Sequence, residues 1–194
     1  MEEYIIINKT KCHQYWPKTT EDIINFDNIS IHLLAEEEIL KNAVIQRQFL
    51  ITNESETFTI TQLQITCWND HSIPEDEWGY KSIELVSTYI DDHRSQDSNT
   101  PILIHCRYII ILLEPNSAGI GRTGTYIAIY NIIKCLGIIH KDNKMNNQKV
   151  DLCFSVFNVV RKLREQRKGM VTDSIQYKFI YEFTLNWIKN NIDY

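Results

Sequence analysis

The sequence predicts a single α/β domain, and three features of the chain carry that prediction. The segment Thr57–Ile65 alternates polar and apolar residues with a period of two, which is typical of a half-buried β-strand. The run Pro101–Ile104 is apolar and predicts a buried strand. A glycine-rich segment follows, and the mostly apolar residues from Tyr126 to Cys135 predict a helix after it. A chain of 194 residues is long enough for one domain with a substantial core.

The same apolar patterns, and the polar stretches between them, give the remaining elements. Polar stretches at Asp91–Thr100 and Lys141–Lys149 are expected to be surface loops. Strands are expected near Tyr4–Ile7, Asp27–Leu34, Ala43–Asn53, Glu56–Trp68 and Ile102–His105. Helices are expected near Tyr80–His93, Thr123–Leu136, Asp151–Arg167 and Ser174–Asn190. The expected architecture is a mixed, twisted sheet flanked by helices, with residues 1–194 forming one domain.

Composition and charge argue against several classes of protein. Acidic residues outnumber basic ones, 25 to 20, and a net charge of −5 does not favour general nucleic-acid binding. No run of about 18 apolar residues is found, so no membrane-spanning helix is expected. The chain opens with Met1-Glu2-Glu3, which is acidic where a signal peptide is basic, and a cytoplasmic location is therefore expected.

The cysteine count fits the same compartment. Five cysteines are an odd number, and they lack the paired spacing of metal sites, so reduced thiols and no metal are expected. Four of them are expected to be small buried hydrophobic side chains: Cys12, Cys67, Cys135 and Cys153. The fifth, Cys106, differs from them because of the residues that follow it.

Cys106 belongs to an interrupted motif. The dipeptide His105-Cys106 is followed, after the ten residues 107–116, by Ser-Ala-Gly-Ile-Gly-Arg-Thr-Gly at 117–124. Without those ten residues the string is His-Cys-Ser-Ala-Gly-Ile-Gly-Arg-Thr-Gly, a Cys-x5-Arg loop between a predicted strand and a predicted helix. Backbone amides of such a loop and of the helix N-terminus converge on one anion. Arg122 would add a planar two-donor fork for a phosphoryl group, and these positive charges favour the nucleophilic thiolate of Cys106.

The restored string resembles the signature loop of the tyrosine-specific protein tyrosine phosphatases. The resemblance implies that Cys106 is the nucleophile and that Arg122 binds the phosphoryl group. It also implies that the Thr123 hydroxyl helps the thiolate to leave and that His105 holds the loop in shape. The phosphoryl group would be bound by the loop residues Ser117, Ala118, Gly119, Ile120, Gly121 and Arg122.

Two further segments resemble motifs of the same family. Lys11–Pro17 is similar to its KCxxYWP segment, which lies on a strand near the active site. Thr66–Asp76 resembles its movable Trp-Pro-Asp loop, and by that match Asp70 is the general acid and later the general base. Asn69 stands where proline is usual and Ser72 where glycine is usual, so a slower general acid is expected.

The last motif lies near the end of the chain. Residues 160–171 and 176–181 resemble the LRxQRxxMVQTxxQYxFIY block, which distinguishes the tyrosine-specific branch from dual-specificity phosphatases. The water-positioning glutamine of that block aligns with Thr172, and its second glutamine aligns with Gln176, which could serve instead. Most charges of the basic run are expected to lie on a solvated helix face.

The resemblance covers the chain from about Lys11 to Tyr181 and implies a protein tyrosine phosphatase. Such an enzyme hydrolyses phosphotyrosine on partner proteins through a cysteinyl-phosphate and needs no metal or other cofactor. The N-terminal part of the family domain, which sets the depth of the phosphotyrosine pocket, is expected to be absent.

The ten residues 107–116 leave three hypotheses open. They are a true insertion that separates the nucleophile from its anion-binding loop, or a retained intron whose removal in frame restores Cys106-Ser117. In the third hypothesis the chain is a catalytically impaired pseudophosphatase that binds phosphotyrosine or a partner. The insert is rich in Ile and Leu, with high β propensity, so as true protein it would be an aggregation risk if exposed.

Overall fold

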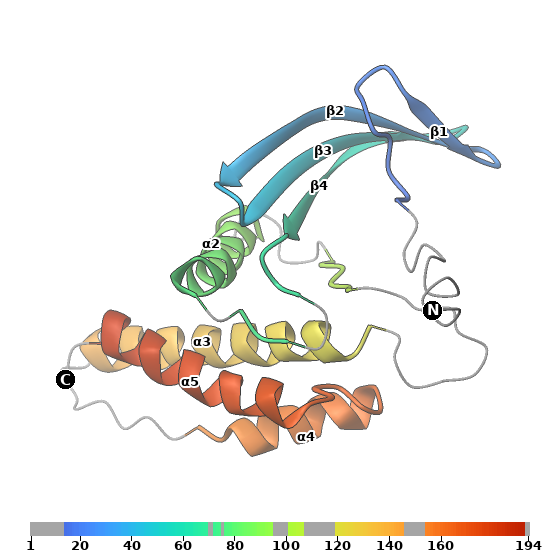
Figure 1. Ribbon diagram of the computed structural model, residues 1–194. Helices are drawn as coiled ribbons and strands as arrows, with labels where there is room; N and C mark the ends of the chain where they lie inside the picture. The colour runs from blue at the N-terminus through green and yellow to red at the C-terminus, as the bar shows by residue number, and fades with distance from the viewer. Residues whose placement is uncertain are drawn as a thin grey trace, which may run out of the picture. The chain divides into compact units, whose positions relative to one another are not determined.

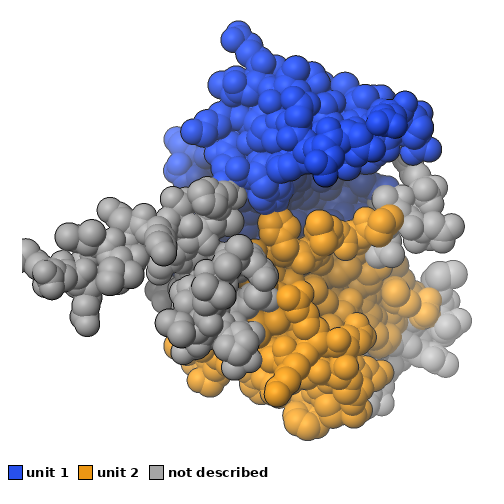
Figure 2. Space-filling view, turned by 90° about the vertical axis from the view of Figure 1, so that its right-hand side faces the viewer, with its two compact units in different colours: residues 1–69, 74–96 blue, residues 70–73, 97–194 orange. Residues whose placement is uncertain are grey.

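The computed structural model describes residues 14–69, 72–74, 76–94, 101–106, 119–145 and 154–192. The chain divides into two units, residues 1–69 with 74–96 and residues 70–73 with 97–194, coloured separately in Figure 2. The first unit carries the described sheet and one helix, and the second carries three helices (Figure 1). The expectation of one domain over residues 1–194 stays a prediction.

The sheet of the first unit is a four-stranded antiparallel meander with strand order β1-β2-β3-β4 (Figure 1). Each strand pairs with the next along the chain. Phe49 on β3 lies opposite Leu33 on β2 and Ile60 on β4, and both Phe49 and Leu33 are buried. The strands are β1 (Ile23–Phe26), β2 (Ile29–Leu40), β3 (Val44–Thr52) and β4 (Thr57–Ile65).

Polar residues fix the turns of the meander. Asp27 and Asn42 have φ angles of 49° and 58°, in the left-handed region that Asp and Asn tolerate better than most residues. Between β3 and β4 the Asn53 side-chain oxygen accepts hydrogen bonds from the backbone amides of Ser55 (2.9 Å) and Glu56 (2.7 Å). Short, defined turns hold neighbouring strands in register.

Helix α2 (Glu77–Arg94) completes the first unit. Its N-terminus is capped by Asp76, whose carboxylate accepts a hydrogen bond of 2.8 Å from the Gly79 amide. Ile83 and Val86 are buried on one face of the helix. Ser82 Oγ lies 3.3 Å from the Cys67 thiol, which links α2 to the segment that follows β4.

The second unit consists of helix α3 (Gly121–Met145) packed against α4 (Val156–Gln166) and α5 (Ser174–Asn191) (Figure 1). Helix α4 begins after Ser155, whose hydroxyl accepts a hydrogen bond of 3.3 Å from the Asn158 amide. Fully buried apolar side chains from α3 and α5 form the core: Ile129, Ile132, Leu136, Phe179, Ile180 and Phe183. Among the described residues, none of the helices combines the length and apolar content that crossing a membrane requires.

Most of the predicted elements are confirmed. The strands expected at Asp27–Leu34, Ala43–Asn53 and Glu56–Trp68 correspond to β2, β3 and β4, and the predicted helices correspond to α2 to α5. β1 was not predicted. Tyr4–Ile7 lies outside the described residues.

The strand predicted at Ile102–His105 is wrong. Residues 101–106 form no strand, and the Leu103 side chain is 87% exposed. An apolar run predicts burial, but an extended segment becomes a strand only when a neighbour satisfies its backbone hydrogen bonds. The sheet in the described part of the chain is antiparallel, and the expected α/β fold class is confirmed.

Smaller corrections concern helix ends and cysteines. The predicted loops at 91–100 and 141–149 begin too early, because α2 continues to Arg94 and α3 to Met145. Helix α4 starts at Val156 rather than near Asp151, because Ser155 caps it. Cys135 is exposed and Cys67 half-buried, so neither is the buried side chain expected from its type alone.

Candidate active site

The glycine-rich part of the motif leads directly into α3. Gly119 has a φ of 67°, and the buried Ile120 accepts a hydrogen bond of 3.1 Å at its carbonyl oxygen from the Gly124 amide. Gly121, Arg122 and Thr123 then form the first turn of the helix. The first turn of a helix has amides without helical partners and the positive end of the helix dipole, so it suits an anion.

The Thr123 hydroxyl in this turn is buried and has no described hydrogen-bond partner. Thr123 is only 5% exposed, and its Oγ1 has no hydrogen-bond partner in the part of the chain that the structure describes. Thr125, two residues later, is also buried, but its Oγ1 donates to the Gly121 carbonyl oxygen over 3.0 Å. A buried hydroxyl without a partner costs stability, so the Thr123 oxygen is available for a ligand or reacting group.

The loop between α4 and α5 packs tightly against the start of α3. The Val171 amide donates to the Ile120 carbonyl oxygen over 3.0 Å. A Cβ atom on Gly124 would lie only 2.6 Å from the Val171 nitrogen, and one on Gly169 would lie 2.9 Å from the Ile120 side chain. Glycine at 124 is therefore a condition of this packing, whereas glycine at 169 is favoured by its φ of 83°.

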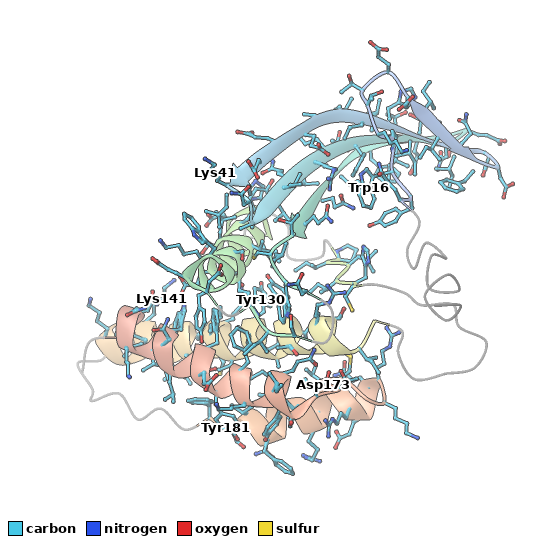
Figure 3. All side chains as sticks on the ribbon, in the orientation of Figure 1. Trp16, Lys41, Tyr130, Lys141, Asp173 and Tyr181 are labelled. Carbon is cyan, nitrogen blue, oxygen red and sulfur yellow. The ribbon has the colours of Figure 1, made fainter. Side chains whose placement is uncertain are left out.

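The side chains of Thr172 and Gln176 lie beside Gly121 in the first turn of α3. A Cβ atom on Gly121 would lie 2.8 Å from Thr172 Oγ1 and 3.2 Å from Gln176 Nε2. Thr172 Oγ1 donates to Gln176 Oε1 over 3.2 Å, and Gln176 is buried with 1% exposure. Figure 3 shows Asp173, the neighbour of Thr172, at the beginning of α5. Thus the structure brings Gln176 to the first turn of α3, and Thr172 with it.

Arg164 is the first arginine of the LRxQR part of the motif at residues 160–171, and the structure gives it specific partners. Its guanidinium donates to the carbonyl oxygens of Met170 and Val171, each over 2.9 Å. The motif includes Arg164, but its spacing to residues 170 and 171 does not predict these hydrogen bonds. Val171 itself has a φ of 64°, which the sequence does not reveal for a β-branched residue.

The nucleophile candidate lies on the segment 101–106. Cys106 is a half-buried free cysteine, and His105 Nδ1 lies 3.3 Å from its carbonyl oxygen. No described hydrogen bond joins the Cys106 thiol to the start of α3. Asp70, Ser117 and Ala118 lie outside the described residues.

In the first unit, the Tyr-Trp-Pro part of the KCxxYWP segment packs against the sheet. The Tyr15 hydroxyl accepts a hydrogen bond of 2.9 Å from Gln62, and the Trp16 ring lies 4.8 Å from the Arg47 guanidinium (Figure 3). Arg47 is 5% exposed, forms an ion pair with Glu36 and donates to the side-chain oxygens of two β4 residues, Gln62 (3.0 Å) and Gln64 (2.7 Å). These contacts explain how a buried charge is tolerated in the sheet.

Comparison with known proteins gives relatives along most of the chain. Tyrosine-protein phosphatase 2 of Dictyostelium discoideum is 32% identical over 180 residues, which cover 89% of this chain and 40% of that protein. Receptor-type tyrosine-protein phosphatase epsilon of Homo sapiens is 31% identical over 191 residues, covering 95% of this chain and 23% of that protein. The chain therefore spans less than half the length of these relatives.

Solved structures show the same fold. A structure of PTPN18 in complex with HER2-pY1196 phosphopeptides matches with a TM-score of 0.70 and 24% identity, over 93% of this chain and 54% of that one. The protein-tyrosine phosphatase family model matches residues 1–186. Because that model covers all but the last few residues, the chain belongs to the protein-tyrosine phosphatase family and has its α/β fold.

Proposed function

We propose that this chain hydrolyses phosphotyrosine on proteins through a cysteinyl-phosphate on Cys106, without a metal or other cofactor. One observation carries the proposal: in the first turn of α3 the buried Thr123 hydroxyl has no partner among the described residues, and Gln176 of α5 lies beside Gly121 of the same turn. An anion-binding helix start and a hydroxyl ready to donate are what the two displacement steps at phosphorus require.

In the first step the Cys106 thiolate attacks phosphorus in line with the tyrosine oxygen. The P–S bond forms while the P–O bond breaks, and Asp70 protonates the departing phenol oxygen. Arg122 and the amides of residues 117–121 hold the phosphoryl oxygens, and they act by positioning and by stabilising negative charge.

In the second step water attacks the cysteinyl-phosphate. Asp70, now ionised, accepts a proton from the water, the P–S bond breaks, and inorganic phosphate is released. The Thr123 hydroxyl donates a hydrogen bond to the departing thiolate. Gln176 orients the attacking water together with Thr172, which stands where the family usually has glutamine.

The proposed partners are phosphotyrosine-containing proteins, and the proposed location is the cytoplasm. The PTPN18 structure, which contains HER2 phosphopeptides, supports this class of partner by analogy. Cys67, Cys106 and Cys135 are free thiols in the described part of the chain, which supports a reducing location.

The ten residues 107–116 separate Cys106 from the loop that must bind the phosphoryl group. In the restored motif Cys106 and Ser117 would be neighbours with Cα atoms about 3.8 Å apart. Because a misplacement of reacting groups by about 1 Å can cost about 10²-fold in rate, we expect weak turnover from the chain as written. Sequencing the mature transcript across codons 106–117 shows which form is translated.

The experiment compares the chain as written with a form lacking residues 107–116, using a phosphotyrosine peptide as substrate. We expect the shortened form to be the faster enzyme, and Cys106→Ser or Asp70→Ala in it to abolish turnover. Cys135→Ser is the matched control, because Cys135 is an exposed thiol on α3 and should leave turnover unchanged. Full activity of Cys106→Ser would refute the mechanism.

A second candidate function is a pseudophosphatase that binds phosphotyrosine or a partner without turnover. The observation that favours it is the segment 101–106, which forms no strand and exposes Leu103, although it ends with the proposed nucleophile Cys106. Phosphopeptide binding by the chain as written, with no phosphate released from either form, would favour this function over the enzyme.

A further inference from the structure

The loop between α4 and α5 contains a backbone conformation that needs external support. Val171 has a φ of 64°, and a β-branched residue in the left-handed region is an outlier. Such strain persists only where the surrounding structure fixes it, and it is concentrated at functional sites. Val171 is 1% exposed, so its surroundings are protein rather than solvent.

One support comes from the α4 side of the loop. Arg164 Nε donates to the Met170 carbonyl oxygen and Arg164 Nη2 to the Val171 carbonyl oxygen, both over 2.9 Å. The planar guanidinium thus binds two successive carbonyl groups at once, which a single ammonium group does not reproduce.

The other support comes from the start of α3. The Val171 amide donates to the Ile120 carbonyl oxygen over 3.0 Å, and Gly124 leaves the space that the Val171 backbone fills. The strained residue is therefore held between Arg164 on one side and the signature helix on the other.

We infer that Arg164 is a positioning residue, which fixes this loop so that Thr172 and Gln176 face the first turn of α3. Thr172 directly follows the held peptide, and its hydroxyl donates to Gln176. Both side chains approach Gly121 so closely that a Cβ atom there would meet them at 2.8 to 3.3 Å. The kinetic consequence rests on the proposed function, whereas the effect on the loop does not.

The chain offers a matched control on the same helix. Arg161 is one turn before Arg164 and pairs with Glu165, and both of these side chains are more than half exposed. Arg161→Ala therefore removes the same charge from α4 without touching the carbonyl groups of the loop.

The first measurement is amide hydrogen exchange in the full chain as written. In Arg164→Ala we expect the Val171 amide to exchange roughly tenfold faster or more, because the loop opens locally once its two charged hydrogen bonds are lost. Amides of the buried core of α3 and α5 should be unchanged, as should Val171 in Arg161→Ala. Unchanged exchange at Val171, or equally faster exchange throughout the unit, would overturn the inference.

The second measurement is steady-state and burst kinetics. It uses the full chain or the form lacking residues 107–116, depending on which of the two releases phosphate. In Arg164→Ala, loss of water positioning should slow only the breakdown of the cysteinyl-phosphate. We therefore expect kcat and KM to fall together by roughly tenfold or more, while kcat/KM stays unchanged. A burst of phenol release should precede the steady state. A general structural defect would lower kcat/KM instead and would contradict the assignment. If no form releases phosphate, the proposed function fails while the exchange measurement still decides the role of Arg164.

Arg164→Lys separates geometry from charge. Lysine keeps the positive charge but lacks the fork, so we expect exchange at Val171 to remain faster than in the parent chain. Complete recovery with lysine would show that charge alone suffices and would overturn the proposed fork.

Discussion

At the level of single residues, Thr123 and Thr125 form a natural pair for testing the active site. Both are buried in the first turns of α3, but only the Thr125 hydroxyl has a described partner, the Gly121 carbonyl oxygen. We predict that Thr123→Val leaves the free energy of unfolding unchanged or higher and slows turnover. Thr125→Val should lose about 1 kcal/mol of stability with its hydrogen bond. Urea unfolding and phosphatase assays of both variants test this, and a clear loss of stability in Thr123→Val would contradict it.

Two glycines of the same helix make a second pair. A Cβ atom on Gly124 would collide with the Val171 nitrogen at 2.6 Å, whereas one on Gly137 would meet its nearest neighbour, on Trp187, at 3.9 Å. Gly124→Ala should therefore lower the free energy of unfolding by about 1 to 3 kcal/mol, because backbone must move. Gly137→Ala should raise it by about 0.5 to 1 kcal/mol through helix propensity. Equal effects of the two substitutions in urea unfolding would rule out the tight packing.

The sequence could predict the motif residues at this scale but not the contacts that support them. Arg122, Thr123 and Gln176 could be identified because they match motifs of the protein tyrosine phosphatases. The roles of Arg164 and Val171 depend on backbone torsion and on a three-dimensional approach between α4 and the loop. An arginine in a basic run has the same local pattern whether it faces solvent or binds carbonyl groups.

At the scale of the elements, α2 contains Glu84, whose ionisation is expected to change the free energy of unfolding with pH. Burial raises the pKa of the Glu84 carboxyl above its ordinary value, so the folded state binds the proton more tightly than the unfolded state. The free energy of unfolding should therefore fall as pH rises from the ordinary glutamate pKa through the raised one.

Glu84→Gln removes this ionisation. We predict that the variant matches the parent chain in strong acid and is more stable at neutral pH, by less than about 1 kcal/mol because Glu84 is partly exposed. Glu77→Gln in the first turn of α2 should have the opposite sign at neutral pH, because it loses the ion pair with Lys81 and a favourable helix-dipole contact. Thermal unfolding of the three proteins against pH tests the prediction, which fails if Glu84→Gln destabilises at neutral pH.

Elements with a periodic pattern were predictable, and those that depend on a neighbour were not. The alternation in Thr57–Ile65 gave β4, and the apolar runs after Gly124 and Ser174 gave α3 and α5. Ile102–His105 has an equally apolar pattern and forms no strand, because strand formation requires pairing that sequence alone does not supply.

At the scale of the whole molecule, the chain belongs to the family although ten residues interrupt the motif on which the proposed activity depends. The family model matches residues 1–186, and the first turn of α3 packs closely against the loop between α4 and α5. The ten residues 107–116 stand between this loop and Cys106. The central claim is that Cys106 carries the phosphoryl group between the two half-reactions.

The most direct test is mass spectrometry of protein quenched with acid during turnover of a phosphotyrosine peptide, using the form lacking residues 107–116. We expect a peptide containing Cys106 that is heavier by one phosphoryl group, and no such adduct in Cys106→Ser. Turnover with no phosphoryl group on Cys106, or with one on another cysteine, would contradict the account.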